Sequence, residues 1–437
     1  MSRIVESLIC GAFVVSCGDG GGPDGMNGDA AMAEDGTAPP RRGDGSTDAA
    51  RDRFDGAEVP ATVGACEVTS AFELVGGDTD TYPIDVAVRG REIGLLYVAE
   101  SPRRMVFGSS TLDEPEIASP ETLGETPVLN QAGIVPFESG FAIAWTDFTE
   151  EPVGRVRIAR TLGGTVVSDV RIGGEWIASG AIPGRTSSGR LAVLWGEQLP
   201  PVEQYELRVA LSDDAETFDP HAVIAAGMAR PSVVSAVTTD DSMAVTWVDR
   251  VNSPNLSTLR FASVLDDGTI TAPRTIVEHD RYIYETSLAY GYERLLLATT
   301  DSRADILTVP MYLTVLEPDG TTVEEGIRLT TDDHQEHVGI AFGANAFGLV
   351  SVPFIDMASS NEQQVFFRQT SADGETLTDP QQVSAASIPE SDCCIRANHA
   401  RITAIEPALY LVVWAEHAQR PDRPVFVVRG AIVNCKP

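Results

Sequence analysis

Six short apolar segments of this chain end in a carboxylate, and this recurrence is the strongest sign of chemistry in the sequence. Examples are GLLYVAE and FAIAWTD, and the final acids, here called the anchor acids, are Glu100, Asp147, Glu197, Asp249, Asp301 and Glu416. A seventh segment, FGLVSVPF, carries Pro353 instead. Clustered carboxylates can hold calcium, which takes about six to eight oxygen ligands. A pair held about 5 to 9 Å apart can cleave a glycosidic bond. Repeated acids can equally bond to nearby backbone, so a structural role stays open.

Histidines accompany the anchor acids. His417 follows Glu416 directly, while His279, His334, His337 and His399 lie in segments that should link one repeat to the next. The spacing His334-x-x-His337, with acids nearby, could hold a transition metal, although a histidine pair on a polar loop is more often simply solvated. We therefore regard the anchor acids with His279, His334, His337 and His417 as candidates for a ligand-binding face. No catalytic residue is assigned, and the metal is unspecified, with calcium the first expectation.

The anchor acids belong to a repeat of about 52 residues, because successive anchor positions lie 47 to 63 residues apart. Four of the five tryptophans stand two residues before an anchor acid, namely Trp145, Trp195, Trp247 and Trp414. We expect them to pack between neighbouring sheets. Tight-turn sequences such as LDDGT and EPDGT follow 17 to 21 residues after an anchor. An Asp-Gly pair between apolar runs indicates a β-hairpin, for which we expect a type I′ turn.

Each repeat therefore holds four short antiparallel strands, and no segment shows convincing helical periodicity. Seven such units over residues 63–437 predict an all-β, seven-bladed β-propeller. A pair of β-sandwiches would not explain the equal intervals. In a propeller the loops after the second strands and the loops between blades emerge on one face, so the anchor acids should form a ring there.

The two ends of the repeat region complement each other. The last repeat lacks a fourth strand, while the segment CEVTSAFELV at Cys66 has no repeat of its own. Pairing this segment onto Val425–Val433 would complete the seventh blade and remove an exposed sheet edge. A Cys66–Cys435 disulfide would stand where other blades have a hairpin turn. Cys393 and Cys394 then remain for each other, as a vicinal disulfide or as two free thiols.

The N-terminus predicts export. Residues 1–17 contain one basic residue, Arg3, followed by an apolar stretch that ends at Cys17. The sequence Val14-Val15-Ser16-Cys17 resembles the lipobox of bacterial lipoproteins, which implies cleavage before Cys17 and lipidation of its thiol. Glu6 within the apolar stretch departs from that pattern. Residues 18–62 are rich in Gly, Asp, Ala and Pro, and we expect a disordered tether. The chain would then be a lipoprotein of the cell envelope, on the outer membrane or the cell surface.

Composition limits the partners. The chain has 64 acidic and 31 basic residues, a formal charge of −33, and Lys436 is its only lysine. Such a surface repels phosphate backbones, so nucleic acid is not an expected partner. No apolar run after Cys17 is long enough to cross a membrane. A monomer is expected.

Two turn sequences, SDDAETF at Ser212 and SADGETL at Ser371, resemble degenerate Asp-box turns of sialidase-like propellers. In that family these turns are structural and lie opposite the active site, and its catalytic residues cannot be placed in this chain. We therefore expect a binding module for a protein, glycan or surface ligand. The alternative is a carbohydrate-active hydrolase or lyase with its site at the mouth of the central channel.

Overall fold

The computed structural model describes residues 66–435 apart from short gaps, and no helix in this part is long and apolar enough to cross a membrane. The gaps are residues 70, 101–102, 126–131, 148–153, 174–177, 200–203, 229–230, 251–256, 280–281, 303–308, 331–334, 345, 357–359, 385–396, 419 and 421–424. The chain divides into two compact units, 1–57 and 58–437, and every described residue belongs to the second. Cys17, the tether, Cys393, Cys394 and His334 lie outside the described residues.

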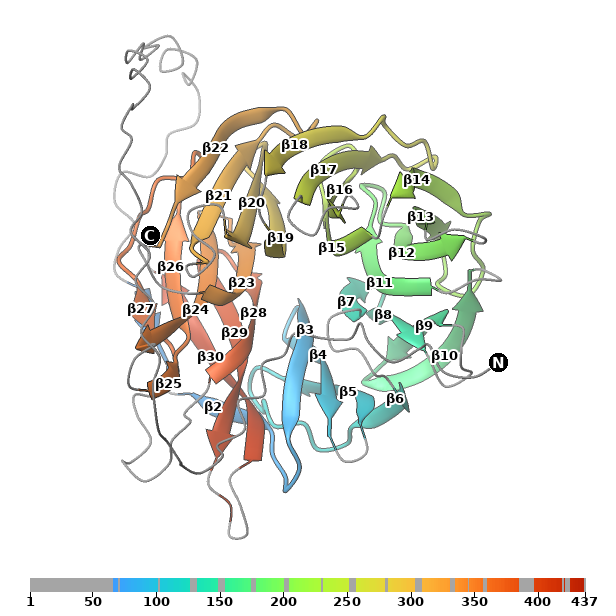
Figure 1. Cartoon of the computed structure of the whole chain (residues 1–437). Helices are drawn as coiled ribbons and strands as arrows, with labels where there is room; N and C mark the ends of the chain where they lie inside the picture. Colours follow the sequence, from blue (N-terminus) through green and yellow to red (C-terminus); the bar gives the residue numbers. More distant parts are fainter. Residues whose placement is uncertain are drawn as a thin grey trace, which may run out of the picture. The chain divides into compact units, whose positions relative to one another are not determined.

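The second unit forms seven antiparallel sheets, and the predicted seven-bladed β-propeller is confirmed (Figure 1). Blade 1 comprises β3 (Thr81–Arg89), β4 (Glu92–Ala99), β5 (Arg104–Thr111) and β6 (Glu121–Glu125). Blade 2 comprises β7 (Ala132–Phe137), β8 (Gly140–Asp147), β9 (Arg155–Leu162) and β10 (Thr165–Ile172). Blade 3 comprises β11 (Ala178–Arg185), β12 (Leu191–Leu199), β13 (Gln204–Ser212) and β14 (Ala222–Met228).

The remaining four blades follow the same pattern. Blade 4 comprises β15 (Pro231–Thr238), β16 (Met243–Arg250), β17 (Ser257–Val264) and β18 (Arg274–His279). Blade 5 comprises β19 (Ile283–Gly291), β20 (Arg294–Asp301), β21 (Met311–Leu316) and β22 (Thr322–Arg328). Blade 6 comprises β23 (Gln335–Phe342), β24 (Phe347–Asp356), β25 (Ser360–Gln363), β26 (Phe366–Thr370) and β27 (Gln381–Gln382). Blade 7 comprises β28 (Ala397–Glu406), β29 (Leu409–Ala418) and β30 (Val425–Cys435), completed by β1 (Cys66–Val68) and β2 (Phe72–Val75).

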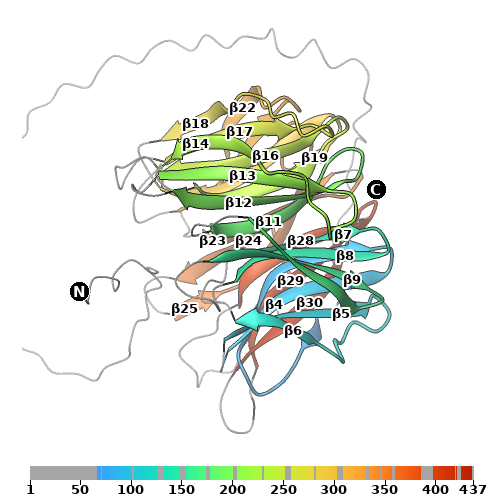
Figure 2. The ribbon, with the colours of Figure 1, turned by 90° about the vertical axis from the view of Figure 1, so that its right-hand side faces the viewer.

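The first strand of each blade lies nearest the centre of the ring. Each of β3, β7, β11, β15, β19, β23 and β28 contacts the first strand of the next blade, and β28 contacts β3 to close the circle (Figure 1). In the side view the strands run across the thickness of the ring, and consecutive strands such as β8 and β9 lie next to one another (Figure 2). The starts of first strands, the ends of second strands and the starts of third strands therefore share one face of the propeller.

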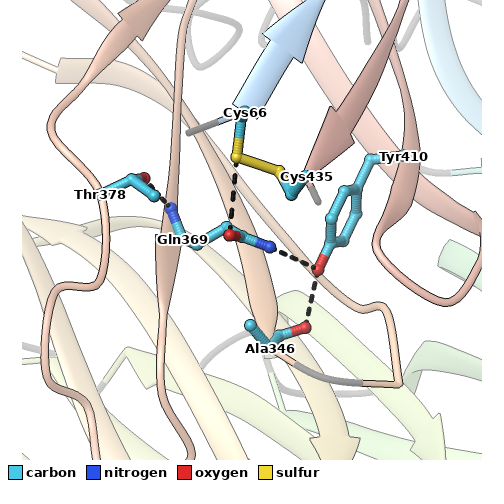
Figure 3. Close-up of a disulfide and its surroundings, with 6 residues drawn as sticks. All are labelled: Cys66, Ala346, Gln369, Thr378, Tyr410 and Cys435. Carbon is cyan, nitrogen blue, oxygen red and sulfur yellow. Dashed lines mark hydrogen bonds between the residues drawn. A yellow bond between two sulfur atoms is a disulfide. The ribbon is translucent and has the colours of Figure 1, made fainter. Parts of the chain in front are cut away.

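The ring closes as the sequence predicts. Both β1 and β2 pair antiparallel with β30, so strands from the two ends of the propeller share blade 7. Cys66 lies directly opposite Cys435, and the two form a disulfide. Buried polar groups adjoin it: Gln369 Oε1 lies 3.5 Å from Cys66 Sγ, and the Tyr410 hydroxyl donates to the Ala346 carbonyl at 2.7 Å (Figure 3). With β1 and β2 paired to β30, blade 7 has its outermost strand.

The four repeated tryptophans are fully buried between blades, as predicted. Trp145 packs in one cluster with Phe107 of blade 1, and Trp247 packs with Leu194 of blade 3. Each indole thus fills the space between its own blade and the preceding one. Because indoles are the largest side chains, each of these four contributes a large buried apolar surface to its interface between blades.

The hairpin turns occur where predicted, but the Asp-Gly turns are not of type I′. In LDDGT only Gly268 has a positive φ, and the Gly268 N–H donates to the Leu265 carbonyl at 3.0 Å. A type I turn followed by a left-handed glycine fits this pattern, because only that last residue needs positive φ. A turn in which both central residues have positive φ occurs instead in blade 2, at Gly163 and Gly164.

Candidate functional site

The anchor acids lie at the ends of second strands, but most of them are buried inside the ring. Glu197 and Asp301 are completely shielded from solvent, and Asp147 is 2 % exposed. Asp249 and Glu416 are each 8 % exposed, while Glu100 is half-buried just beyond β4. Their carboxylates are therefore mostly inaccessible from the surface.

Arginines on the third strands neutralise several of these acids. Arg157 reaches Asp147 at 2.9 Å, Arg208 reaches Glu197 at 2.6 Å, and Arg260 reaches Asp249 at 3.3 Å. In each blade this arginine stands directly opposite the repeated tryptophan, so the strand register brings the two together. Within the described residues, these three acids thus pair with arginine side chains of the same blade.

The indole nitrogens add a second contact in two blades. Trp195 Nε1 donates to Glu197 at 3.3 Å, and Trp414 Nε1 donates to Glu416 at 2.7 Å. In blade 5, which lacks the tryptophan, Thr299 Oγ1 donates to Asp301 instead, at 3.3 Å. Among the described residues, no group of three or more His, Cys, Asp or Glu side chains is placed to hold a metal ion. Asp147, Glu197 and Asp249 thus join the second strand of their blade to the third.

A row of five rings crosses the face that carries the anchor acids. His337 contacts His399 with ring centroids 4.6 Å apart, and His399 contacts Tyr82 at 5.4 Å. Tyr82 contacts Phe426 at 5.0 Å, and Phe426 contacts His417 at 4.0 Å. We call these five residues the aromatic row. It starts at the first strands of blades 6 and 7, passes β3 of blade 1, and ends on the second and third strands of blade 7.

The aromatic row begins at irregularities in the inner strands. Register shifts interrupt the pairing of the first and second strands in six blades, and in blades 6 and 7 the shifted segments contain His337 and His399. His399 has a φ of +54°, in the left-handed region that favours glycine, and the corresponding segment of blade 3 has Gly180 with a φ of +68°. Such bulges redirect a side chain, and a strained non-glycine residue is a recognised mark of a functional position.

Charged groups surround the inner end of the row, and we call Asp85, Glu285 and Arg401 the axial charges. His337 Nδ1 lies 2.8 Å from Glu285 Oε1, while the Val338 N–H donates to Glu285 Oε2 at 3.1 Å. Asp85 accepts from the backbone N–H groups of Val86 and Ile134. Arg401 Nε donates to the Ile84 carbonyl at 2.6 Å. Four neighbouring blades thus contribute to one polar cluster.

The pKa values of this cluster depart from their ordinary values. Burial lowers the pKa of His399 well below 6.5, and the nearby His337 and Arg401 lower it further, so its imidazole is neutral at pH 7. Burial works to raise the pKa of Glu285, but the His337 ring and Arg401 hold it below 4.5. Burial raises the pKa of Asp85 above 3.8. A neutral imidazole offers one hydrogen-bond donor and one hydrogen-bond acceptor to a ligand.

The structure brings some of the predicted residues together and leaves others apart. His337 and His417 join the aromatic row, whereas Asp147, Glu197 and Asp249 are occupied by arginines. The backbone of His279 ends β18, and its side chain lies outside the described residues, as does all of His334. Tyr82, Phe426 and Arg401 were not predicted. The arginine partners had a visible signal, since each follows its anchor acid by 10 or 11 residues.

Comparisons with known proteins show the fold and no family. No protein-family model matches the chain. No curated protein matches it.

Among solved structures, polysaccharide lyase Uly1 aligns with a TM-score of 0.50 and 9% identity, over 80% of this chain and 89% of that one. A protein of unknown function from Dyadobacter fermentans aligns with a TM-score of 0.49 and 9% identity, over 85% and 99%. A subtype N11 neuraminidase-like protein of A/flat-faced bat/Peru/033/2010 (H18N11) aligns with a TM-score of 0.43 and 12% identity, over 85% and 94%. At identities this low, the likeness shows the β-propeller fold alone.

Proposed function

We propose that this protein is an exported, lipid-anchored β-propeller that binds a glycan along the aromatic row. The observation that carries the proposal is the row itself, because its rings come from three neighbouring blades and four of the five are only partly buried. Binding sites for small ligands combine aromatic surfaces with a few convergent polar groups. Sugar rings present C–H faces that pack on aromatic rings and hydroxyls that bond to histidine, so the row with the axial charges suits a saccharide.

The test is isothermal titration of the full chain with a panel of oligosaccharides, both neutral and acidic. His417→Ala and Tyr82→Ala each remove one ring of the row, and each should weaken binding by roughly tenfold, as loss of an aromatic contact does. Tyr292→Ala is the matched control, because this tyrosine is 44 % exposed and lies in the turn after β19, at the opposite end of its blade. Equal losses in all three variants, or no binding by any saccharide, would contradict the proposal.

A carbohydrate-active lyase or hydrolase remains the second candidate, favoured by one observation. The neutral His399 imidazole lies close to the Arg401 guanidinium, and a general base beside a cation is what proton abstraction from a sugar requires. The same panel incubated with the protein should then yield new reducing ends, and His399→Asn should abolish them. Binding without any product over a long incubation would leave the protein a binding module.

The envelope location rests on the sequence Val14-Val15-Ser16-Cys17 and the Gly/Asp-rich segment 18–62 that follows. Labelling with a radioactive or clickable fatty acid should mark the wild-type chain and fail to mark Cys17→Ala. Cys10→Ala is the control, because Cys10 belongs to the segment that cleavage would remove. Unchanged labelling and membrane partitioning of Cys17→Ala would show that the lipid anchor does not exist.

A further inference from the structure

Arg401 is the only cation among the three axial charges, and its hydrogen bonds go to backbone carbonyls. Its Nε donates to Ile84 O at 2.6 Å, and its Nη1 donates to Ala400 O at 2.9 Å. Among the described residues, its Nη2 has no hydrogen-bond partner. The two carbonyls hold the guanidinium in place, while Asp85 and Glu285 interact with its charge electrostatically but do not hydrogen-bond to it. Arg401 is thus a fixed cation with a free donor.

The two acids near Arg401 have no carboxylate oxygen without a hydrogen-bond partner. Both oxygens of Glu285 are occupied, by His337 and by the Val338 N–H. The two carboxylate oxygens of Asp85 accept hydrogen bonds from the N–H groups of Val86 and Ile134. By contrast, the third-strand arginines such as Arg157 and Arg208 bond directly to carboxylates. In a chain with 33 more acids than bases, an arginine without a bonded carboxylate is suited to one supplied by a ligand.

His399 offers a second unused polar group beside Arg401. No hydrogen bond to its ring nitrogens occurs within the described part of the chain, while its ring contacts His337 in a tilted arrangement and Tyr82 in an edge-to-face one. A neutral imidazole carries one donor and one acceptor nitrogen, which matches a sugar hydroxyl. The strained backbone of His399, with its φ of +54°, holds the ring in this position.

We propose that the ligand is a carboxylate-bearing saccharide, with its carboxylate on Arg401 Nη2 and a hydroxyl on His399, next to the inner end of the aromatic row. This inference rests on the proposed function and names the ligand class for the same site. Guanidinium is the side chain that best matches a carboxylate, and such charge-assisted hydrogen bonds are roughly twice as strong as neutral ones.

The negative charge of the whole chain does not prevent this contact. Repulsion between exposed charges is screened beyond about 8 Å at physiological ionic strength, whereas a direct contact with the partly buried Arg401 is screened much less. We therefore expect that raising the salt concentration within the physiological range leaves the affinity nearly unchanged.

The experiment compares acidic oligosaccharides with their own methyl esters, which keep the sugar ring and remove the charge. Oligomers of galacturonate, of mannuronate and of hyaluronan serve as probes, titrated into the full chain by calorimetry. At least one acid should bind roughly tenfold or more tightly than its ester. Arg401→Gln should remove this preference and leave the affinity for the ester unchanged. Arg91→Gln, the same change at an exposed residue in the turn after β3, should leave both affinities unchanged.

The outcomes separate this inference from the proposed function. If acid and ester bind equally well, and His417→Ala weakens both, the glycan site stands and the carboxylate inference is wrong. If no acid and no neutral oligosaccharide binds, both are wrong. Because Arg401→Gln also removes the bond to Ile84 O, its thermal unfolding is compared with wild type. If that variant does not fold, Arg401→Lys, which keeps the charge but not the paired donors, should retain part of the preference for the acid.

Discussion

The Glu197 carboxylate illustrates what the anchor acids do as single residues. It has no solvent exposure, and its Oε2 receives both Arg208 and the Trp195 indole, while its Oε1 has no partner within the described residues. A charge in such a place is stable only while its counter-charge is present. For Glu197, as for Asp147 and Asp249, the acid at the end of the second strand thus pairs with an arginine of the third.

We expect Glu197→Gln to lower the free energy of unfolding by about 2–3 kcal/mol, because Arg208 loses its buried partner but keeps Glu206. The control is Glu216→Gln, whose side chain is 48 % exposed and pairs with Arg160. There the loss should stay within about 1 kcal/mol. Urea unfolding followed by tryptophan fluorescence measures both, and similar losses in the two variants would contradict the structural role of Glu197.

His399 predicts a pH dependence. Its pKa in the folded chain lies well below 6.5, because burial and the adjacent Arg401 disfavour the charged ring. The unfolded chain then binds more protons than the folded chain, so stability is complete above the unfolded pKa and falls as the pH drops below about 6.5. Glu285 does not contribute to this change in stability, because its pKa lies below 4.5 and it becomes protonated only in more acidic solution. Urea unfolding at pH 7.5 and pH 5.5 should show this loss, and His399→Asn, which tolerates positive φ, should reduce it.

At the scale of one element, the hairpin glycines differ in what surrounds them. Gly268 and Gly320 have nearly equal φ values of +83° and +82°. A Cβ on Gly268 would meet only Leu211 Cδ1 at 3.8 Å, whereas a Cβ on Gly320 would lie 2.2 Å from Phe261 Cδ1 of the preceding blade. Gly320 thus packs against the preceding blade, whereas the space around Gly268 is nearly open, although Asp266 of the same turn accepts hydrogen bonds from Ser187 and Ser188 of blade 3.

We therefore expect Gly268→Ala to cost about 1–2 kcal/mol of stability, the strain of a left-handed alanine. Gly320→Ala should cost that strain and roughly 1–3 kcal/mol more for overpacking against Phe261. Chemical denaturation of the two variants side by side separates the cost of backbone strain from the cost of overpacking against Phe261. If both lose the same stability, the contact between the turn and Phe261 is unimportant.

Features that repeat within each element were predictable, and features that depend on neighbouring blades were not. The repeat length, the buried tryptophans and the unpaired strand at Cys66 are visible along the chain. The aromatic row is not, because His337 and His399 are 62 residues apart and meet only where blades 6 and 7 adjoin. The bulge that aims His399 has no glycine to signal it, unlike Gly180 in blade 3.

At the scale of the molecule, closure of the ring is the remaining constraint on stability. In blade 7 the outermost strand comes from the other end of the propeller domain, so no hairpin turn connects β1 to its neighbour β30. The three residues of β1 give few hydrogen bonds of their own. The disulfide therefore fixes an edge that would otherwise fray, and it does so in a buried setting beside Gln369 and Tyr410 (Figure 3).

The Cys66–Cys435 bond spans 369 residues, so it restricts the unfolded chain strongly. Loop-closure entropy puts the stabilisation at about 5 kcal/mol as an upper bound, and native disulfides of small domains typically contribute about 2–5 kcal/mol. We expect the double variant Cys66→Ala/Cys435→Ala to lose about 2–5 kcal/mol of unfolding free energy, which lowers its urea midpoint. It should retain its β-sheet circular dichroism. A reducing agent should shift the wild-type midpoint toward that of the variant and leave the variant unchanged. Peptide mapping without reduction that joins Cys66 to any other cysteine would contradict the closure, and unchanged stability of the variant would show that strand pairing alone holds the ring.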